Sequence, residues 1–199
     1  MSWREPFTRF MTKPLHRCSW VPTDKPYYVA YHDTEWGVPV HDDRLHFEML
    51  SLEGAQCGLS WDIILRRRDG YRQAYKGFDP KKVARMTDAE LAALVKNPDI
   101  IRHRRKIFSV RTNALVFLAI QKEFGSFDAY IWQFVGGQPQ INRPKHLLDV
   151  PPRTELSDTL SADLKKRGMS WVGTAVMYSY MQAVGLMNDH TTDCFRAPA

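Results

Sequence analysis

The sequence lacks the features of a disulfide-stapled, membrane-spanning or repetitive protein. Three cysteines are too few for a disulfide framework. No apolar run approaches the roughly 18 residues that a transmembrane helix requires, and neither repeats nor low-complexity linkers interrupt the chain. Short alternating runs of polar and apolar residues, which would indicate half-buried strands, are also missing. These absences exclude a small secreted scaffold and a membrane protein, and they favour a helical globular domain.

The N-terminal stretch MSWREPFTRFMTKPLHR is basic and has no apolar core of the kind that secretion signals need. We therefore expect a reducing cytoplasmic setting, in which Cys18, Cys57 and Cys194 are thiols or metal ligands. Residues 1–17 are expected to form a poorly ordered extension and residues 18–199 one domain, since that length fits a single core. No sustained apolar heptad marks an assembly surface, so we expect a monomer.

The charge balance favours a polyanionic partner. The chain carries 28 Lys and Arg against 22 Asp and Glu, a net charge of +6, and its sequence pI is about 9.3. The basic residues gather in RRR at 66–68, HRRK at 103–106 and KKR at 165–167. Each cluster is equally consistent with the solvated face or end of a helix.

Helical periodicity, with the caps and breakers that delimit helices, predicts an all-α fold. Helices are expected over 44–57, over 61–75, from Asp79-Pro80, from the capping box of Thr87 and Glu90, over about 103–124, from Ser126 to Gly136-Gly137, from Ser157 to Gly168, and over 173–184. Residues 138–156 contain four prolines and no clear period, so they are expected to form a loop.

The segment VKNPDIIRHRRKI joins two of the expected helices. A tight connection followed by a helix that begins with Arg and His would present backbone amides and basic side chains together. Such a unit holds phosphates without reading bases. A plain helix–helix connection is the simpler interpretation of the local sequence, and both stay open.

Two pairs of Cys and His lie at opposite ends of the chain. Cys18 and His32 fall in CSWVPTDKPYYVAYH, and His190 and Cys194 in HTTDC. Two thiolates and two imidazoles suit tetrahedral zinc, and four protein ligands would make the site structural. The spacings differ from the common C-x2-C type, so on spacing alone four unrelated residues are the more economical interpretation.

The stretch FEMLSLEGAQCGLSW places Glu53 in an otherwise apolar segment. Burying an unpaired carboxylate costs several kcal/mol, so this acid must be hydrogen-bonded, paired or used by a ligand. A helix-to-loop clamp that accepts backbone amides explains Glu53 as well as a pocket does. Aromatic residues such as Trp20, Tyr28 and Tyr31 more often belong to a hydrophobic core than to a pocket. Cys57 is expected to be a buried, inert thiol.

Several long motifs, taken together, resemble the 3-methyladenine DNA glycosylase I family. They are CSWVPTDKPYYVAYHDTEWGVPVHDD, FEMLSLEGAQCGLSWDIILRRR, IIRHRRKI, LKKRGMSWVGTAVMYSYMQAVGLMNDH and HTTDC, and they extend from about residue 18 to 194. The resemblance implies an all-helical fold of the helix–hairpin–helix glycosylase superfamily, with that unit near 87–122. It also implies a constitutive bacterial enzyme that removes 3-methyladenine from double-stranded alkylated DNA, associated with the nucleoid when bound.

The resemblance assigns roles to individual residues. It implies one structural zinc ion held by Cys18, His32, His190 and Cys194, and a damaged base contacted by Glu53, Trp20, Tyr28, Tyr31 and Trp61. Glu53 is assigned to base recognition first and is the candidate catalytic residue. DNA contacts are expected at the hairpin near 97–103 and, within the basic clusters, at Arg102, His103, Arg104, Lys165, Lys166 and Arg167.

Two departures and two rivals remain. The hairpin lacks the Gly-x-Gly of the wider superfamily, and the superfamily's usual catalytic aspartate has no counterpart. No lysine is marked as a Schiff-base nucleophile, so base removal without strand cleavage is expected. A protein that binds alkylated DNA without catalysis is the first rival. A metallohydrolase is the second, and it would need an open position on the metal.

Overall fold

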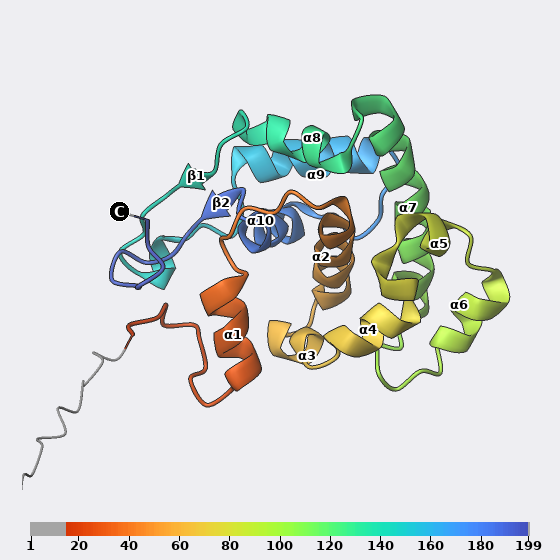
Figure 1. Ribbon diagram of the computed structural model, residues 1–199, viewed down its shortest axis with the longest axis horizontal. Helices are drawn as coiled ribbons and strands as arrows, with labels where there is room; N and C mark the ends of the chain where they lie inside the picture. Colours follow the sequence, from red (N-terminus) through yellow and green to blue (C-terminus); the bar gives the residue numbers. More distant parts are fainter. Residues whose placement is uncertain (1–14, 199) are drawn as a thin grey trace, which may run out of the picture.

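The computed structural model describes residues 15–198 (Figure 1). Most of the extension expected over 1–17 therefore lies outside the described residues. Arg17 is tied to the folded part, because its guanidinium donates to the Asp33 carboxylate at 2.9 and 2.7 Å. The backbone amide of Phe195 donates to the carbonyl of His16 at 2.8 Å. The two ends of the described chain thus meet on one side of the molecule.

The described structure is mostly helical, as expected. Its helices are α1 (Pro26–Thr34), α2 (Asp43–Gln56), α3 (Trp61–Leu65), α4 (Arg68–Ala74), α5 (Pro80–Ala84), α6 (Asp88–Leu94), α7 (Arg104–Phe124), α8 (Phe127–Trp132), α9 (Glu155–Lys166) and α10 (Thr174–Ala183), with 3-10 turns η1 (Lys76–Phe78), η2 (Gln133–Val135) and η3 (Leu147–Asp149). No helix within residues 15–198 is both long and apolar enough to cross a membrane.

Helix α2 is the centre of the fold. Every residue from His46 to Ala55 is buried, as expected for a helix surrounded on all sides. In Figure 1, α8 and α9 lie above α2, and α3 and α4 lie below it. Helices α5 to α7 lie on one side, and α1 and the two ends of the described chain lie on the other. Phe117 of α7 joins the layers, since its ring packs 5.2 Å from Phe47 and stacks 4.1 Å from Phe127. Glu53 is therefore held on the most buried helix of the protein.

Helix ends that depend on local caps were predicted well. The capping box of Thr87 and Glu90 opens α6, and Asp79 caps α5 with Pro80 at its first position. Ser126 caps α8, and its hydroxyl accepts a hydrogen bond from the Ala129 amide. These interactions lie within three residues of each other, so the sequence alone contains them.

Three expectations need correction. The helix expected over 61–75 is two helices, because the chain bends at Arg67 (φ −106°, ψ 2°) and Arg68 turns inward to acidic partners. Helix α9 begins three residues earlier than expected, with Thr154 as the cap. The loop expected over 138–156 contains β1 (Gln140–Ile141) and η3, and β1 pairs in parallel with β2 (Met187–Asn188). Two-residue strands are too short to leave a period in the sequence.

The region around α1 also differs from expectation, because no helix was predicted there. The Lys25 side chain makes no capping hydrogen bond, and Pro26 at the first helical position is the one local start signal. Helix α1 carries Tyr28, Tyr31 and His32. Its formation places two expected base contacts and one expected metal ligand on a single element.

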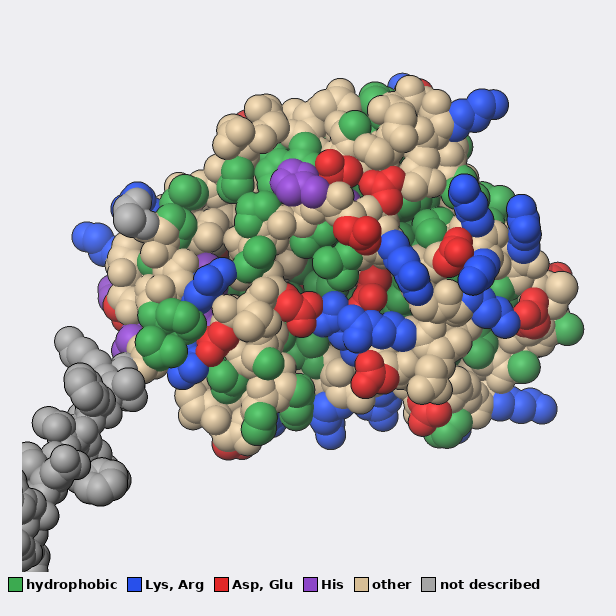
Figure 2. Space-filling view, in the orientation of Figure 1, with side chains coloured by type: hydrophobic (Ala, Val, Ile, Leu, Met, Phe, Trp, Pro, Cys, Tyr) green, Lys and Arg blue, Asp and Glu red, His purple; other side chains and the backbone are tan. Residues whose placement is uncertain are grey.

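Acidic and basic side chains are mixed on the face shown in Figure 2. Lys and Arg gather over α5 to α7, whereas red and blue side chains lie side by side over the middle of the molecule. The RRR cluster contributes to ion pairing, because Arg68 bonds both Glu35 and Glu48 at 2.6 Å. The Glu35 carboxylate is therefore ion-paired rather than a free acid.

Candidate functional site

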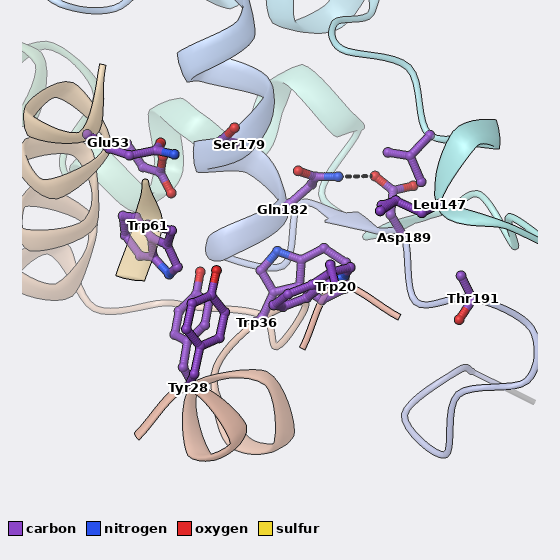
Figure 3. A pocket seen from close by; sticks show the side chains of 13 residues that line it. Trp20, Tyr28, Trp36, Glu53, Trp61, Leu147, Ser179, Gln182, Asp189 and Thr191 are labelled. Atoms are coloured by element: carbon purple, nitrogen blue, oxygen red, sulfur yellow. Dashed lines mark hydrogen bonds between the residues drawn. The ribbon is translucent and has the colours of Figure 1, made fainter. Parts of the chain in front are cut away.

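A cavity of about 430 Å³ lies between α1, α2, α3, α10 and η3 (Figure 3). That volume is in the range of small-molecule sites. The residues that line it are Trp20, Tyr28, Tyr31, Trp36, Glu53, Gln56, Trp61, Leu147, Val150, Ser179, Gln182, Asp189 and Thr191. All five residues that were expected to contact a base therefore line the same cavity.

The cavity is rich in aromatic rings. Tyr31 of α1 lies 5.4 Å from Trp61, the first residue of α3, with the rings tilted by 52°. Trp20 packs edge-on against Trp36 at 4.9 Å and 73°, and its ring centroid is 5.9 Å from that of Tyr28. Ring faces attract cations and stack on flat π-systems. The cavity therefore suits a flat, electron-poor ligand.

Two buried polar atoms in this cavity have no hydrogen-bond partner among the described residues. They are Glu53 Oε2 and Trp61 Nε1. Glu53 is 3% exposed, and burial raises the pKa of its carboxyl to about 8. The clamp interpretation required backbone amides on the carboxylate, and Oε2 accepts none. An acceptor and a donor that are left open in one cavity indicate that a ligand supplies their partners.

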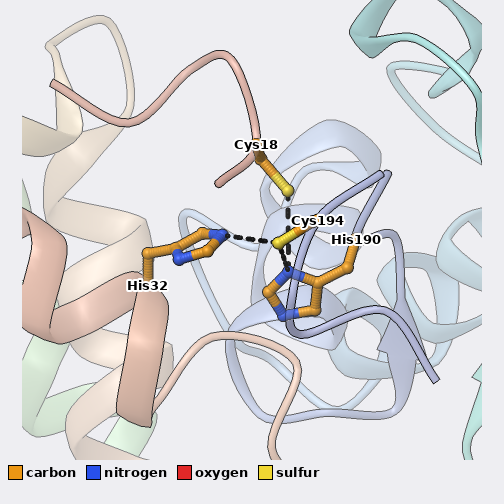
Figure 4. A group of neighbouring side chains, drawn as sticks. All are labelled: Cys18, His32, His190 and Cys194. Atoms are coloured by element: carbon orange, nitrogen blue, oxygen red, sulfur yellow. Dashed lines mark hydrogen bonds between the residues drawn. The ribbon is translucent and has the colours of Figure 1, made fainter. Parts of the chain in front are cut away.

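A second group of buried polar side chains lies beside the cavity. Cys18, His32, His190 and Cys194 converge from both ends of the described chain, and their candidate ligand atoms all lie within 4.8 Å of one another (Figure 4). The Cys18 Sγ is 3.6 Å from His190 Nδ1, and Cys194 Sγ is 3.5 Å from His32 Nε2 and from His190 Nδ1. The two Cys–His pairs noted at opposite ends of the sequence thus form one cluster in the structure.

The cluster has the dimensions of a tetrahedral zinc site. Zn–S bonds of about 2.3 Å and Zn–N bonds of about 2.0–2.1 Å place sulfur and nitrogen ligands about 3.6 Å apart, which matches the distances above. Burial lowers the pKa of His190 to about 4, so its imidazole is neutral, the form that binds metal. Burial raises the pKa of the Cys18 thiol to about 11, so a cation is needed to hold it as a thiolate at neutral pH.

The second nitrogen of each imidazole is held by the surrounding protein. His32 Nδ1 lies 2.7 Å from Asp33 Oδ1, and His190 Nε2 donates to the carbonyl of Trp36 at 3.1 Å. Such partners fix the ring orientation of metal-bound histidines. Gly37 permits the close approach, because a Cβ at this position (φ +74°) would lie 3.1 Å from His190 Nε2. The donor set and its surroundings both fit a metal ion.

Comparison with known proteins identifies the family. A family model described as methyladenine glycosylase matches residues 20–197. The chain is 47% identical over 180 residues to DNA-3-methyladenine glycosylase 1 of Escherichia coli (strain K12), covering 90% of this chain and 96% of that protein. The chain belongs to the methyladenine glycosylase family.

Solved structures agree with this assignment. A crystal structure of 3-methyladenine DNA glycosylase I matches this methyladenine glycosylase with a TM-score of 0.89 at 48% identity, covering 92% of this chain and 100% of that one. A structure of 3-methyladenine DNA glycosylase I from Staphylococcus aureus, solved to explain 3-methyladenine recognition, matches with a TM-score of 0.86 at 35% identity. It covers 89% of this chain and 94% of that one. The resemblance inferred from the sequence motifs is confirmed.

The basic residues expected to contact DNA fall into two separate places on the methyladenine glycosylase. Arg102, His103 and Arg104 lie where the chain enters α7, and the His103 side chain caps that helix. Arg167, by contrast, forms ion pairs with Asp163 and with Glu123 at the other end of α7. Helix α7 is about 30 Å long. The cluster at 165–167 is therefore a helix length away from the one at 102–104.

The sequence analysis did not predict several residues that line the cavity, and it predicted the wrong burial for Cys57. Trp36 lines the cavity, and its signal was its position in the HDTEW motif, four residues after His32. Gln182 and Asp189 were missed because nothing local marks them, although they bond to each other at 2.6 Å (Figure 3). Cys57 is exposed rather than buried, because it directly follows the last residue of α2 and faces outward from the turn.

Two tryptophans outside the pocket lining, Trp132 and Trp171, differ in their surroundings. Trp132 is buried, and its indole donates to the carbonyl of Val40 at 3.0 Å. Trp171 is half-buried and has a left-handed backbone conformation, with φ +61°. A non-glycine residue in this region is strained. Trp171 is therefore more than core filling.

Proposed function

We propose that this methyladenine glycosylase flips a damaged nucleotide out of double-stranded alkylated DNA and excises 3-methyladenine by hydrolysing the N-glycosidic bond. The observation that carries the proposal is the buried, unpartnered Glu53 carboxyl group in an aromatic cavity. Relatives named as DNA-3-methyladenine glycosylases, at up to 47% identity over most of the chain, support it. Extrusion of the base costs a few kcal/mol and is easiest for damaged pairs.

The proposed pocket discriminates by charge. Adenine methylated at N3 is a cation while it is attached to deoxyribose, whereas normal adenine is neutral. Stacking and cation–π contacts with Tyr31, Trp61 and their neighbours are each worth roughly 0.5–2 kcal/mol to a cation. Glu53 adds a charge-assisted hydrogen bond to the polar edge of the base. Trp61 Nε1 supplies a donor for the same edge, and both groups gain less from normal adenine.

The chemical step needs little acid catalysis, because the cationic base is a good leaving group. We propose that water attacks the sugar as the glycosidic bond breaks and that strand cleavage does not follow. No lysine lines the cavity within residues 15–198, which supports a monofunctional enzyme without a Schiff base. A covalent enzyme–DNA adduct trapped by borohydride would contradict this part of the proposal.

The proposed DNA-binding unit is the helix–hairpin–helix near 87–122. Helices α6 and α7 pack against each other around the connection that contains Asp99, and Arg102, His103 and Arg104 extend from its end. Phosphate contacts at this point would lie beside α2, the helix of Glu53. Lys165, Lys166 and Arg167 lie about 30 Å from this connection, a distance that a duplex covers in about nine base pairs at 3.4 Å per step.

The cluster of Cys18, His32, His190 and Cys194 is proposed to hold one structural zinc ion. When bound, the ion cross-links the beginning and the end of a domain that we place at residues 18–199. Four protein ligands leave no open position, so the metallohydrolase rival loses its water site. We further propose that the enzyme acts as a monomer on the DNA of a bacterial cytoplasm, in line with its bacterial relatives.

The test is release of free 3-methyladenine from methylated duplex DNA by the intact protein and by Glu53→Gln, measured above pH 8, where the Glu53 carboxyl is ionised. Glutamine keeps the shape of the side chain and removes the charge. Loss of a hydrogen bond to a charged group, worth about 1.5–3 kcal/mol, predicts a rate lower by roughly 10- to 100-fold. Equal rates would leave Glu53 a structural acid.

The same assay separates the enzyme from a protein that only binds damage. Folded, zinc-loaded protein that binds methylated duplex without releasing base would overturn the enzymatic proposal. Release by the intact protein that is accompanied by strand nicks would overturn only its monofunctional part.

A further inference from the structure

The first turn of α7 carries a buried lysine with no acidic partner at its ammonium among the described residues. Lys106 is 9% exposed. Its Nζ donates to the carbonyl of Ala55 at 2.9 Å and to the carbonyl of Cys57 at 2.5 Å. These two carbonyls belong to the end of α2, where the last turn of a helix leaves its acceptors unpaired. A cation is favoured there because the helix dipole is negative at this end.

Along the chain, the carbonyls that Lys106 holds lie between Glu53 and Trp61, the residues that carry the two open polar atoms of the pocket. Glu53 precedes Ala55 by two residues, and Trp61 follows Cys57 by four. The intervening turn contains Gly58 at φ +78°, and the Leu59 amide closes the turn on the carbonyl of Gln56 at 2.6 Å. Lys106 therefore anchors the segment whose conformation sets the distance between Glu53 Oε2 and Trp61 Nε1.

Trp171 covers this lysine from the other side. The Lys106 Nζ is 5.2 Å from the centroid of the Trp171 ring, within cation–π range. The Trp171 Cβ packs so closely on Gly54 that a Cβ at position 54 would lie 3.2 Å from it. Gly54 directly follows Glu53, so the tryptophan touches the backbone that carries the acid.

Helix α7 also holds the strained backbone next to Trp171. Asn113, two turns beyond Lys106, donates to the carbonyl of Ser170 at 2.9 Å and accepts from its amide at 2.9 Å. Asn113 is itself buried. This pair of hydrogen bonds fixes Ser170, the residue that precedes Trp171. It explains how the left-handed backbone conformation of Trp171 persists. Helix α7 thus supports the C-terminal end of α2 in two ways: directly through Lys106, and through Asn113, which holds the backbone next to Trp171.

We propose that Lys106 and Trp171 form a clamp that fixes the C-terminal end of α2, and with it the relative position of Glu53 and Trp61. Both are positioning residues, since neither lines the base pocket. The inference rests on the proposed excision activity and adds two residues to it. Arg102, His103 and Arg104 lie at the start of α7, directly before Lys106. The His103 ring packs edge-on against Trp171 at 5.6 Å. The proposed DNA contacts at the start of α7 and the shape of the pocket therefore both depend on Lys106 and Trp171.

The experiment compares Lys106→Met with Lys122→Met. Both variants remove one positive charge from α7, but Lys122 is exposed. Hydrogen exchange of the amides in 53–61, which needs no activity, is expected to be at least tenfold faster in Lys106→Met and unchanged in Lys122→Met. Single-turnover excision by Lys106→Met is expected to fall roughly 10- to 100-fold, the loss typical of small misplacements in a reacting geometry.

Binding of undamaged duplex separates the clamp from a direct phosphate contact. The dissociation constant of Lys106→Met for undamaged duplex should stay within about threefold of the intact protein, because its ammonium faces protein carbonyls. Lys106→Arg, which keeps the charge, should recover part of the rate. Should Lys106→Met fail to fold, Trp171→Leu tests the same clamp by the same exchange measurement.

Each other outcome has one meaning. Unchanged exchange in 53–61 together with an unchanged rate would overturn the clamp. Equal losses of rate and DNA affinity with unchanged exchange would replace it with a phosphate contact. Faster exchange in a protein whose intact form releases no base would keep the clamp and overturn the proposed function instead.

Discussion

The pocket and the Cys–His cluster share a wall, yet their buried polar atoms are partnered differently. Trp36 lines the pocket while its carbonyl accepts from His190, and Thr191 lines the pocket while its hydroxyl contacts Cys18 Sγ at 3.6 Å. In the cluster, both ring nitrogens of each histidine have a neighbour. In the pocket, Glu53 Oε2 and Trp61 Nε1 have none. A closed set of ligands is typical of a structural site, and open polar atoms are typical of a binding site.

The largest expected effect tests whether the cluster is only structural. Cys194→Ser removes one of the proposed thiolate ligands. The proposed cross-link closes a loop longer than 100 residues, for which chain-entropy arguments give about 5 kcal/mol. For a domain of this size such a loss lowers Tm by roughly 10–20 °C. Thermal unfolding with metal analysis measures it.

Cys57→Ser is the matched control, because Cys57 is the exposed third cysteine and its substitution should leave Tm and metal content unchanged. Base release per folded molecule of Cys194→Ser, assayed well below its Tm, should stay close to that of the intact protein. A folded Cys194→Ser protein without activity would erase the distinction between the two regions.

The pH dependence of excision tests whether the pocket is the active region. The Glu53 carboxyl has a pKa of about 8 because it is buried, so the free enzyme gains the carboxylate as pH rises through 8. Since kcat/KM reports the pKa values of the free enzyme, it should fall about tenfold per pH unit below 8. In Glu53→Gln this limb should vanish. A profile that is flat between pH 6 and 8 in the intact protein would contradict the assignment.

Stability should respond to the same group with the opposite sign. The folded pKa of Glu53, about 8, lies above its ordinary value of 4.5, so between these values the folded state binds a proton that the unfolded state lacks. Folding stability from this group is therefore present below pH 4.5 and is lost as pH rises toward 8, by at most about 1.4 kcal/mol per unit. Chemical denaturation of the intact protein and Glu53→Gln at pH 5, 6.5 and 8 measures the difference, which should shift in favour of the variant. A constant difference would mean that Glu53 is ionised throughout.

The helix caps and the Cys–His cluster were predictable for different reasons. Thr87 and Ser126 act on residues three positions away, so their role is contained in a few letters of sequence. Cys18 and Cys194 could be joined only through the family resemblance, because their separation in the chain carries no spacing rule. The fold then brings His32 and His190 to the same point, which no local pattern required.

What the sequence could not predict depends on contacts between distant elements. The break at Arg67 follows from ion pairs of Arg68 with Glu35 and Glu48, which are 33 and 20 residues away. The exposure of Cys57 follows from the position at which α2 ends. Gln182 and Asp189 face the cavity because α10 and β2 meet beneath it, and such side chains look like any surface polar residue in a sequence. Burial patterns predict helices, whereas the lining of a cavity requires the packed structure.

The smallest expected effect tests how much the aromatic ring of Tyr28 contributes to base recognition relative to Glu53. Tyr28 and Tyr31 both line the pocket, but Tyr28 is half-buried whereas Tyr31 is buried. A cation–π contact at a partly exposed position is worth about 0.5–1 kcal/mol, so Tyr28→Leu should lower kcat/KM for methylated duplex only about two- to fivefold. Tyr28→Phe, which keeps the ring, should lower it by less. If Tyr28→Leu instead matches Glu53→Gln in its loss, ring contacts rather than the buried acid dominate recognition, and the contrast between open polar atoms and closed ligands no longer identifies the active region.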